Sequence, residues 1–366
     1  MTSDSSAPPT KRKKTSNNEY PPHLIEYVPP TVNDALRATT ITNAGSTAHQ
    51  LSVHDSYTYI SSIPQEIQNH PEDEIILGID EAGRGPVLGS MVYAIAYARK
   101  PALHLLSDTD FDDSKKLTDL KRFELLYAIT ADPDDPHISA ADPQKQLHGE
   151  IGYAMTNLTA RDISSEMLNS ETFNNLNNQA HETTIALIQN ILKLLDGFKV
   201  TEVYIDTVGP PQTYQDKLSK IFPTLNVTVS KKADSIYPIV SAASVVAKVT
   251  RDVLLKKYQQ LQRLSNPDNT EMGSGYPSDP KTVRYLNGKI HDIFGWNQVI
   301  RYSWQTAKTL LTDKTTVVVW EDDIKLKKID YGDNVSSYFK KKDSSENDLE
   351  NLEVSSLWYG NNVISI

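Results

Sequence analysis

The sequence contains no cysteine and no long apolar run. The absence of Cys from all 366 residues excludes disulfide bonds, thiolate metal sites and cysteine nucleophiles, and it suits a reducing compartment. The longest apolar stretches, such as residues 91–98 and 317–320, are far shorter than the run of about 18 residues that a membrane span requires. No apolar leader opens the chain, which argues against secretion. We therefore expect a soluble intracellular protein that does not enter a membrane.

Basic residues are also fewer than acidic ones. The chain has 37 Lys and Arg against 47 Asp and Glu, a formal net charge of −10. This acidic balance disfavours broad, charge-driven binding to nucleic acid. A local basic groove can still lie on an acidic molecule, and acidic residues can be clustered to hold a metal ion. The charge count alone therefore leaves a nucleic-acid partner open.

Composition and periodicity divide the chain into four parts. Residues 1–70 are rich in Ser, Thr, Pro and Asn without sustained periodicity, which predicts a disordered N-terminal arm, and the folded part is expected to begin at Glu74. Strand-like and helical segments then alternate, which predicts an α/β core over residues 71–250. Residues 251–314 are expected to form a helical C-terminal extension. Residues 315–366 are expected to be mobile or to bind a partner.

The predicted arm contains one basic cluster, Lys11-Arg12-Lys13-Lys14. Such a cluster serves as a nuclear-import signal in a disordered segment, or it is simply a solvated run of charge. We expect a nuclear protein.

Apolar runs and helical spacing predict the elements of the core. Residues 75–79 and 87–98 are strand-like and are expected to pair as a hairpin. Thr118 is an expected N-cap for a helix. A long helix is expected over residues 238–261, whose Ala, Ser and Val residues are small enough to pack closely on a sheet. The remaining strands are expected at residues 149–156, 203–205 and 227–229, and further helices near residues 185–195, 280–289 and 303–311.

Acidic residues follow three of the predicted strands. They are Asp80 and Glu81, Asp206, and Asp234. Ligand sites form at the carboxyl ends of strands in α/β sheets, so these side chains converge if the strands are neighbours. Repulsion and burial would raise their pKa values unless cations were bound, and oxygen-only ligands suit Mg²⁺ or Mn²⁺. Two such ions are a recognised device for phosphodiester chemistry. The alternative for any one of these residues is an ordinary solvated acid in a turn.

The segment Gly83-Arg84-Gly85, called here the Gly-Arg-Gly loop, directly follows the first acidic pair. It is not a dinucleotide fingerprint, because the glycine spacing is out of phase and a strand follows. Two glycines flanking an arginine permit a ligand to approach the backbone amides closely. A tight hairpin turn would explain the same glycines equally well.

These residues belong to a longer pattern. Residues 78–86, Gly-Ile-Asp-Glu-Ala-Gly-Arg-Gly-Pro, resemble the signature of the type 2 ribonuclease H family. Further blocks that agree with this family in order and character lie at residues 113–115, 204–209, 232–244 and 273–280. The resemblance spans about residues 74–310 and is closest to the catalytic subunits of eukaryotic members.

The resemblance implies a ribonuclease H-like fold, a mixed sheet flanked by helices, with the C-terminal extension added. It implies endonucleolytic hydrolysis of RNA in RNA–DNA hybrids. It also implies incision on the 5′ side of single ribonucleotides embedded in duplex DNA, with two Mg²⁺ or Mn²⁺ ions. Eukaryotic members further suggest a hetero-oligomer with two accessory subunits, for which the tail after residue 315 is a candidate binding segment.

The resemblance also assigns roles to particular residues. The catalytic, metal-binding carboxylates correspond to Asp80, Glu81, Asp206 and Asp234. The loop residues Gly83, Arg84 and Gly85 resemble the part that grips the ribonucleotide, and Tyr276 matches a tyrosine that senses the 2′-OH. The residues that resemble contacts to the hybrid backbone are Lys115, Asn175 and Arg251.

Two other functions remain open on the sequence. One is a non-catalytic nucleic-acid-binding subunit of a replication or repair complex, whose binding would not depend on the carboxylates. The other is a nuclease of the same fold superfamily that acts on DNA alone, against which the Gly-Arg-Gly loop and Tyr276 argue.

Overall fold

The computed structural model describes residues 21, 24, 27–32, 55–109, 111, 117–131, 147, 149–169, 174–207, 209–265 and 270–316. The basic cluster at residues 11–14, Lys115 and the tail after residue 316 lie outside these residues. Among the described residues, no helix is both long enough and apolar enough to cross a membrane.

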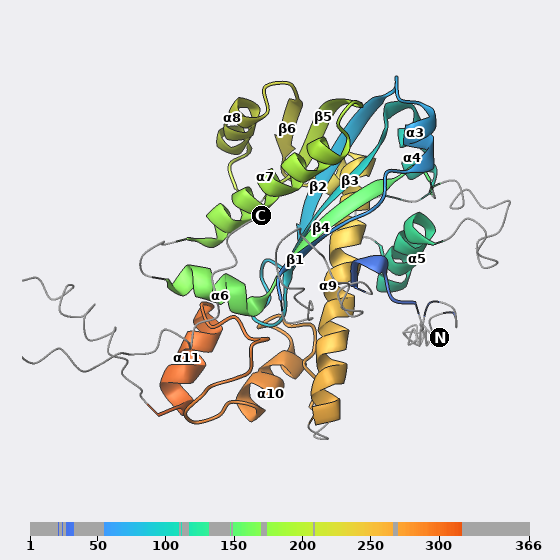
Figure 1. Ribbon diagram of the computed structural model, residues 1–366. Coiled ribbons are helices and arrows are strands. Elements are labelled where there is room, and N and C mark those ends of the chain that lie inside the picture. Colours follow the sequence, from blue (N-terminus) through green and yellow to red (C-terminus); the bar gives the residue numbers. More distant parts are fainter. Residues whose placement is uncertain are drawn as a thin grey trace, which may run out of the picture. The chain divides into compact units, whose positions relative to one another are not determined.

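A six-stranded mixed sheet forms the centre of the fold, in the order β1-β4-β3-β2-β5-β6 (Figure 1). The strands β1, β4, β3 and β2 pair antiparallel, whereas β5 and β6 continue the sheet in parallel with β2. The predicted hairpin and the predicted mixed sheet flanked by helices are confirmed. The strands are β1 (Tyr57–Ile60), β2 (Glu74–Ala82), β3 (Met91–Arg99), β4 (Gly152–Leu158), β5 (Lys199–Asp206) and β6 (Asn226–Ser230).

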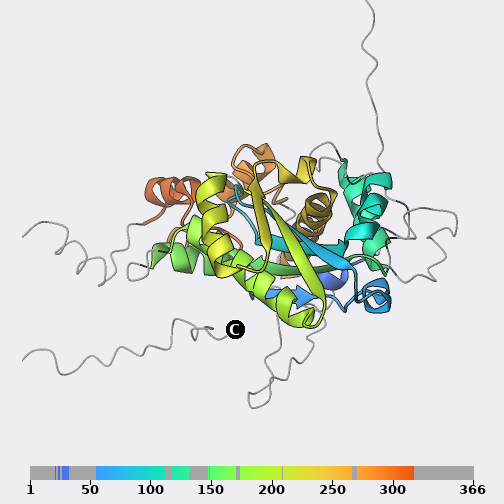
Figure 2. The same ribbon diagram turned by 90° about the horizontal axis from the view of Figure 1, so that it is seen from above.

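Helices cover both faces of this sheet. One face packs against α4, α5 and α9, and the other packs against α7 and α8 (Figure 2). Thr118 accepts a hydrogen bond from the N–H of Lys121 at 3.2 Å, so the expected N-cap of α5 is confirmed. The α-helices are α3 (Gln65–Asn69), α4 (Leu103–Asp108), α5 (Asp119–Thr130), α6 (Ala160–Leu168), α7 (Leu176–Leu194), α8 (Pro211–Ile221), α9 (Pro238–Ser265), α10 (Pro280–Gly288) and α11 (Gln305–Lys314). The 3-10 helices are η1 (Lys100–Ala102) and η3 (Ala233–Ser235).

The alternation of small and large side chains along β3 explains how α9 lies so close to the sheet. Successive side chains of a strand point to opposite faces, and β3 turns small residues toward α9 and large ones toward α7. At Gly78 of β2, an added Cβ would lie 2.5 Å from the backbone carbonyl carbon of Ile239, so no side chain fits there. The small β3 residues are Val92, Ala94, Ala96 and Ala98, and the large ones are Met91, Tyr93, Ile95 and Tyr97.

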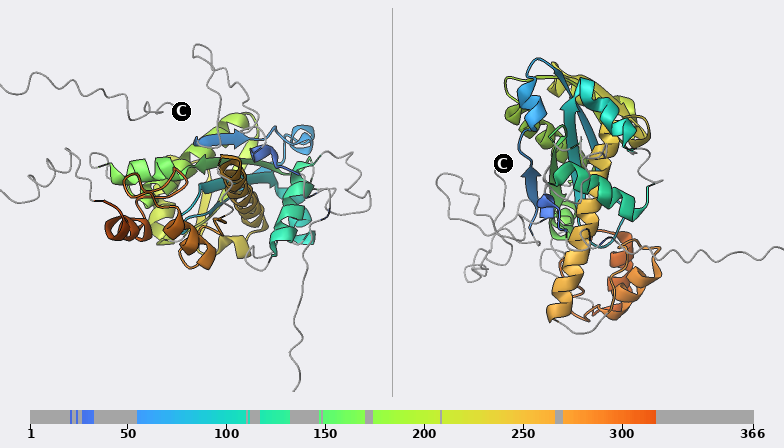
Figure 3. Two further views of the ribbon diagram at one scale, coloured as in Figure 1. Left: turned by 90° about the horizontal axis from the view of Figure 1, so that it is seen from below. Right: turned by 90° about the vertical axis from the view of Figure 1, so that its right-hand side faces the viewer.

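The C-terminal helices pack beside the distal half of α9 (Figure 3). A third apolar cluster joins Tyr258 of α9 to Leu286 of α10 and Ala307 of α11, and it includes Val87 and Leu88 from the loop after β2. The expected helical extension is therefore present and is tied to the segment that follows the Gly-Arg-Gly loop. The expected boundary between residues 250 and 251 lies inside α9, which runs unbroken through it.

The folded part begins earlier than Glu74, which corrects the sequence-based expectation for residues 1–70. The short strand β1 pairs with β4 at the sheet edge, and Ile67 of α3 is fully buried. The Tyr57 hydroxyl donates a hydrogen bond to the carbonyl of Thr31 at 2.7 Å, and Val32 is buried in the α9 face of the core. A four-residue edge strand within polar surroundings has too little periodicity to be recognised from the sequence.

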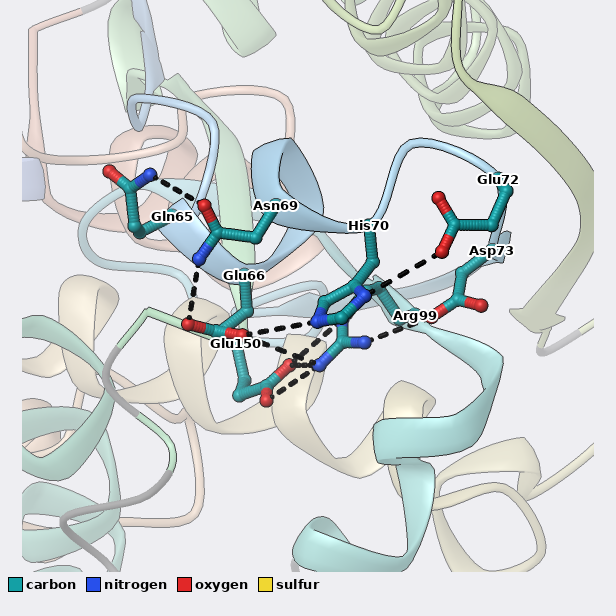
Figure 4. A network of polar contacts seen from close by, with 8 residues as sticks. All are labelled: Gln65, Glu66, Asn69, His70, Glu72, Asp73, Arg99 and Glu150. Atoms are coloured by element: carbon teal, nitrogen blue, oxygen red, sulfur yellow. Dashed lines mark hydrogen bonds and ion pairs between the residues drawn. The ribbon is translucent and has the colours of Figure 1, made fainter.

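Acidic residues surround one arginine at the start of β2. Arg99 ends β3 opposite Ile75, and its side chain is 12% exposed. Its guanidinium donates to Asp73 and to Glu150, each at 2.9 Å, and lies 3.9 Å from Glu66 (Figure 4). We call Arg99 with these three acids the Arg99 cluster; it closes the end of the hairpin opposite to Asp80.

Candidate active site

The sheet order brings the predicted carboxylates to one place. β2, β5 and β6 are neighbours, and Ile79 pairs with Ile205, so Asp80 and Asp206 follow at adjacent positions. Asp80 and Glu81 lie inside β2, which continues to Ala82 because it still pairs with β3. Asp206 is the last residue of β5, and Asp234 lies in η3 beyond β6.

Burial affects the protonation of Asp80 and Glu81 in this acidic group. Asp80 and Asp234 are each 4% exposed. Burial raises the pKa of Asp80 to about 7; the positive charge of Lys248 opposes this rise, and the negative charge of Asp206 adds to it. Burial and the charges of Asp80 and Asp206 raise the pKa of Glu81 to about 8. Ionising Asp80 and Glu81 together is therefore costly in the protein alone.

Protein groups hold the carboxylates in position. The Glu81 N–H donates to Asp80 Oδ1 at 2.7 Å, and the Ala233 N–H donates to Asp206 Oδ1 at 2.8 Å. Lys248 Nζ lies 3.9 Å from Asp234 Oδ2. Among the described residues, no three His, Asp or Glu side chains are arranged as a formed metal site. Because like charges repel, drawing the group together to ligand distance requires a compensating cation.

The donor set fits a hard divalent cation. The side chains of this group offer carboxylate oxygens, with no imidazole or thiolate in the group. Such oxygen ligands suit Mg²⁺ or Mn²⁺ and not the softer metals. A cation would also oppose the raised pKa values of Asp80 and Glu81, because it favours the ionised carboxylates that burial disfavours. The residues present are thus compatible with the group that the sequence predicts.

A cleft of about 700 Å³ opens beside the carboxylates. Glu81, the Gly-Arg-Gly loop, Arg251 and Tyr276 all line it. A Cβ on Gly85 would lie 3.4 Å from the Tyr276 ring, so loop and ring face each other. Tyr276 is 44% exposed, and the Arg251 guanidinium lies 5.9 Å from its ring centroid. Arg251 also donates to the Ser274 carbonyl at 2.6 Å, which fixes the segment before Tyr276.

Basic side chains also line this cleft, although the chain as a whole is acidic. Phosphate groups are bound in proteins chiefly by such side chains and by backbone N–H groups. The basic residues among the described lining are Arg84, Arg122, Lys248, Arg251 and Lys256.

Two predicted substrate contacts, Asn175 and Lys115, are not among the described residues that line this cleft. Asn175 is the N-cap of α7, and its Oδ1 accepts from the N–H groups of Asn177 and Asn178 at 2.9 and 3.1 Å. Asn177 in turn accepts a hydrogen bond from Arg84, so the start of α7 adjoins the Gly-Arg-Gly loop. Lys115 lies outside the described residues.

Sequence reasoning missed three residues around this site. Lys248 lies two turns beyond Val240 on α9 and donates to Ser244 Oγ at 2.7 Å; its i,i+4 spacing from Ser244 was a usable signal. Arg301 and Trp304 contact the Gly-Arg-Gly loop from more than 200 positions away in the chain. No local pattern reveals a contact of that kind.

A family model and two curated relatives indicate the same family for this chain. The family model described as ribonuclease HII matches residues 77–307. A human protein named as a subunit of ribonuclease H2 is 43% identical over 262 residues, covering 72% of this chain and 80% of that relative. The protein of the same name from Schizosaccharomyces pombe is 40% identical over 305 residues, covering 82% of each chain.

Among solved structures, ribonuclease H2 from Pyrococcus horikoshii is similar with a TM-score of 0.49 and 27% identity. That match covers 65% of this chain and 98% of the other. The family assignment depends on the family model and on the two eukaryotic relatives, which span most of the folded part. The chain therefore belongs to the ribonuclease HII family and is a ribonuclease H, a hydrolase that acts on RNA–DNA substrates.

Proposed function

We propose that this chain cleaves the RNA strand of RNA–DNA hybrids endonucleolytically and incises duplex DNA on the 5′ side of single embedded ribonucleotides. The observation that carries this proposal is the juxtaposition of a partly buried acidic group with the cleft that contains the Gly-Arg-Gly loop and Tyr276. The acidic group supplies the hydrolytic chemistry, and the loop and tyrosine supply recognition of ribose.

The catalytic carboxylates are Asp80, Glu81, Asp206 and Asp234, which would hold two ions of Mg²⁺ or Mn²⁺. When bound, such a pair activates a water and stabilises the leaving oxygen in phosphodiester hydrolysis. The raised pKa values of Asp80 and Glu81 support this role, because a cation favours the ionised form that burial otherwise opposes.

Recognition of the substrate falls to the cleft. A single 2′-OH distinguishes a ribonucleotide from its neighbours, and it must be read by hydrogen bonds at close range. Gly85 and Tyr276 are close enough together for both to contact the same sugar. The basic side chains of the cleft, with Asn175 at the start of α7 and Lys115, bind the phosphates of the hybrid.

A cleavage map tests the proposal. The full-length protein is incubated with Mg²⁺ and three substrates: a duplex with one ribonucleotide, an RNA–DNA hybrid and an all-DNA duplex. We expect one nick 5′ of the ribonucleotide, cleavage of the hybrid and no cleavage of DNA. Asp206→Asn should abolish nicking while retaining substrate binding and the circular dichroism spectrum, because Asn can still accept from the Ala233 N–H.

Two outcomes would replace the proposal. Cleavage of the all-DNA duplex would indicate a DNA nuclease of the same fold. Metal-independent binding without turnover, for the chain alone and with co-purified proteins, would indicate a non-catalytic subunit.

The assembly and location are part of the proposal. The curated relatives are named as subunits of ribonuclease H2, which supports a multi-subunit enzyme, and we propose two accessory proteins, contacted by residues 315–366. Purification of the tagged chain from cells should then recover two further proteins in equal amounts. Replacing residues 11–14 by Ala should shift a fluorescent fusion out of the nucleus; an unchanged distribution would remove the import role.

A further inference from the structure

The Gly-Arg-Gly loop is attached to the C-terminal extension by a buried arginine. Arg301 is fully buried, with 0% exposure. Its Nη2 donates to the carbonyl of Gly83 at 2.6 Å, its Nη1 to the carbonyl of Arg84 at 3.2 Å and its Nε to the carbonyl of Gly89 at 2.9 Å. One guanidinium therefore binds two carbonyls of the loop and one just beyond it.

Trp304 completes this attachment. Its indole N–H donates to the carbonyl of Gly85 at 3.1 Å, and its ring centroid lies 4.7 Å from the Arg301 guanidinium. The carbonyls of three consecutive residues, 83 to 85, thus all accept from Arg301 or Trp304.

Carbonyl groups and an aromatic ring, and no carboxylate among the described residues, surround the charge of Arg301. Among the described residues no carboxylate affects it; burial, together with the nearby Arg251, lowers its pKa to about 9. The partial charges of the carbonyls and the face of the Trp304 ring are what accompany the guanidinium. A lysine could not replace this contact set, because only the planar guanidinium presents donors in a fixed fork.

The direction of the carbonyls fixes the direction of the amides. The peptide bonds here are trans, and a trans peptide points its N–H opposite to its C=O. Since the Gly83 and Arg84 carbonyls point to buried Arg301, the N–H groups of Arg84 and Gly85 point away from it, and the loop itself lines the cleft. No group among the described residues accepts a hydrogen bond from these two N–H groups.

We propose that Arg301 and Trp304 are positioning residues, which hold the loop carbonyls inward so that the N–H groups of Arg84 and Gly85 face the ribose of the substrate beside Tyr276. The inference rests on the proposed function for the identity of the substrate. It adds a part of the chain outside the recognised motifs to the recognition of the ribonucleotide.

The test compares two tryptophan substitutions in the full-length protein. Trp304→Phe keeps a ring beside Arg301 but removes the donor to Gly85. Trp296→Phe is the matched control, because it removes an equivalent bond, from Nε1 to the Leu286 carbonyl at 2.8 Å, within the same extension. Both variants lose one hydrogen bond and some stability, but only the first loses a loop contact.

Two readouts are measured for each variant. The first is kcat/KM for the duplex with one ribonucleotide, which Trp304→Phe should lower by about tenfold. The second is deuterium exchange at Val87, Leu88 and Gly89, whose N–H groups donate to Gly275 and Val299; Trp304→Phe should make it faster. Trp296→Phe should leave both readouts within about twofold of the wild type.

Arg301 gives a graded series. Arg301→Met should lower kcat/KM for the embedded ribonucleotide by about a hundredfold, and Arg301→Lys should restore only part of that loss. Equal effects of Trp304→Phe and Trp296→Phe, or no effect of Trp304→Phe on either readout, would overturn the proposal. If the wild type cleaves none of the substrates, the proposed function fails, and the exchange comparison still decides whether Arg301 and Trp304 position the loop.

Discussion

Acidic side chains gather at both ends of the β2–β3 hairpin, and the two groups differ in the cation available to them. In the Arg99 cluster, one guanidinium donates to Asp73 and Glu150 at 2.9 Å (Figure 4). At the other end, Asp80 and Glu81 lie with Asp206 and Asp234, and the Lys248 ammonium is 3.9 Å from Asp234. In the first group a guanidinium hydrogen-bonds directly to two of the acids, whereas in the second the Lys248 ammonium lies at a longer distance from Asp234.

We interpret this difference as one between a structural use of acids and the proposed functional use. Although burial opposes it, the hydrogen bonds that Arg99 donates to Asp73 and Glu150 raise its pKa further. A raised pKa favours the charged form of Arg99. In the other group the charged form is disfavoured, because burial and mutual repulsion raise the pKa of Asp80 and of Glu81. Carboxylates kept buried and under-compensated are typical of sites that bind a cation or transfer a proton.

The largest expected difference is in activity. Asp80→Asn should lower the single-turnover rate of nicking by about 10³-fold or more, because it removes a carboxylate from the proposed catalytic group. Asp73→Asn, the same substitution at the other end of the hairpin, should leave the rate within about twofold at a temperature where both variants are folded. Equal losses of nicking rate in the two variants would show that the two acidic groups do not differ in function.

The second difference is in the pH dependence of stability. With a chelator present, the folded protein keeps protons on Asp80 and Glu81 that the unfolded chain has released, because their folded pKa values are about 7 and 8. The free energy of unfolding should therefore fall by several kcal/mol as the pH rises from about 4.5 to about 8, at about 1.4 kcal/mol for each pH unit over which one extra proton is kept. Urea titrations across this range measure it. Asp206→Asn should flatten the decline, as should Mg²⁺; a stability that rises over this window would contradict the assignment.

The third difference is in the effect on stability of removing one acidic charge from each group. Glu150→Gln should destabilise the protein by about 2–3 kcal/mol, because it leaves the buried guanidinium with fewer charged partners. Urea unfolding at pH 7 measures the loss. In the presence of a chelator, Asp206→Asn should have the opposite sign and raise stability, since it removes a repelling charge.

The smallest expected effect is at the exposed edge of the Arg99 end. Lys100 contacts Glu74 at 3.4 Å and Glu202 at 2.7 Å, but its side chain is 51% exposed. Lys100→Met should leave the free energy of unfolding nearly unchanged, because solvent and salt screen such pairs. A loss comparable to that of Glu150→Gln would show that burial is not what distinguishes the Arg99 cluster.

Much of the fold follows from local patterns. The hairpin of β2 and β3, the N-cap Thr118 and the helix from Pro238 all lie where apolar spacing and capping chemistry predict them. The edge strand β1 does not, because four residues with mixed burial carry little periodicity and gain their stability from pairing with β4. For that reason the sequence places the start of the folded part too late.

Local patterns in the sequence identify the acidic residues, their position near strand ends and the family pattern around them. These features are local, since a motif and a strand can be read within a dozen residues. The three-dimensional fold was needed to show that β5 lies beside β2, which brings Asp206 to Asp80. It also decided that Arg301, 218 positions from Gly83, holds the Gly-Arg-Gly loop. Such contacts depend on how the chain folds back on itself, and neither spacing nor composition records them.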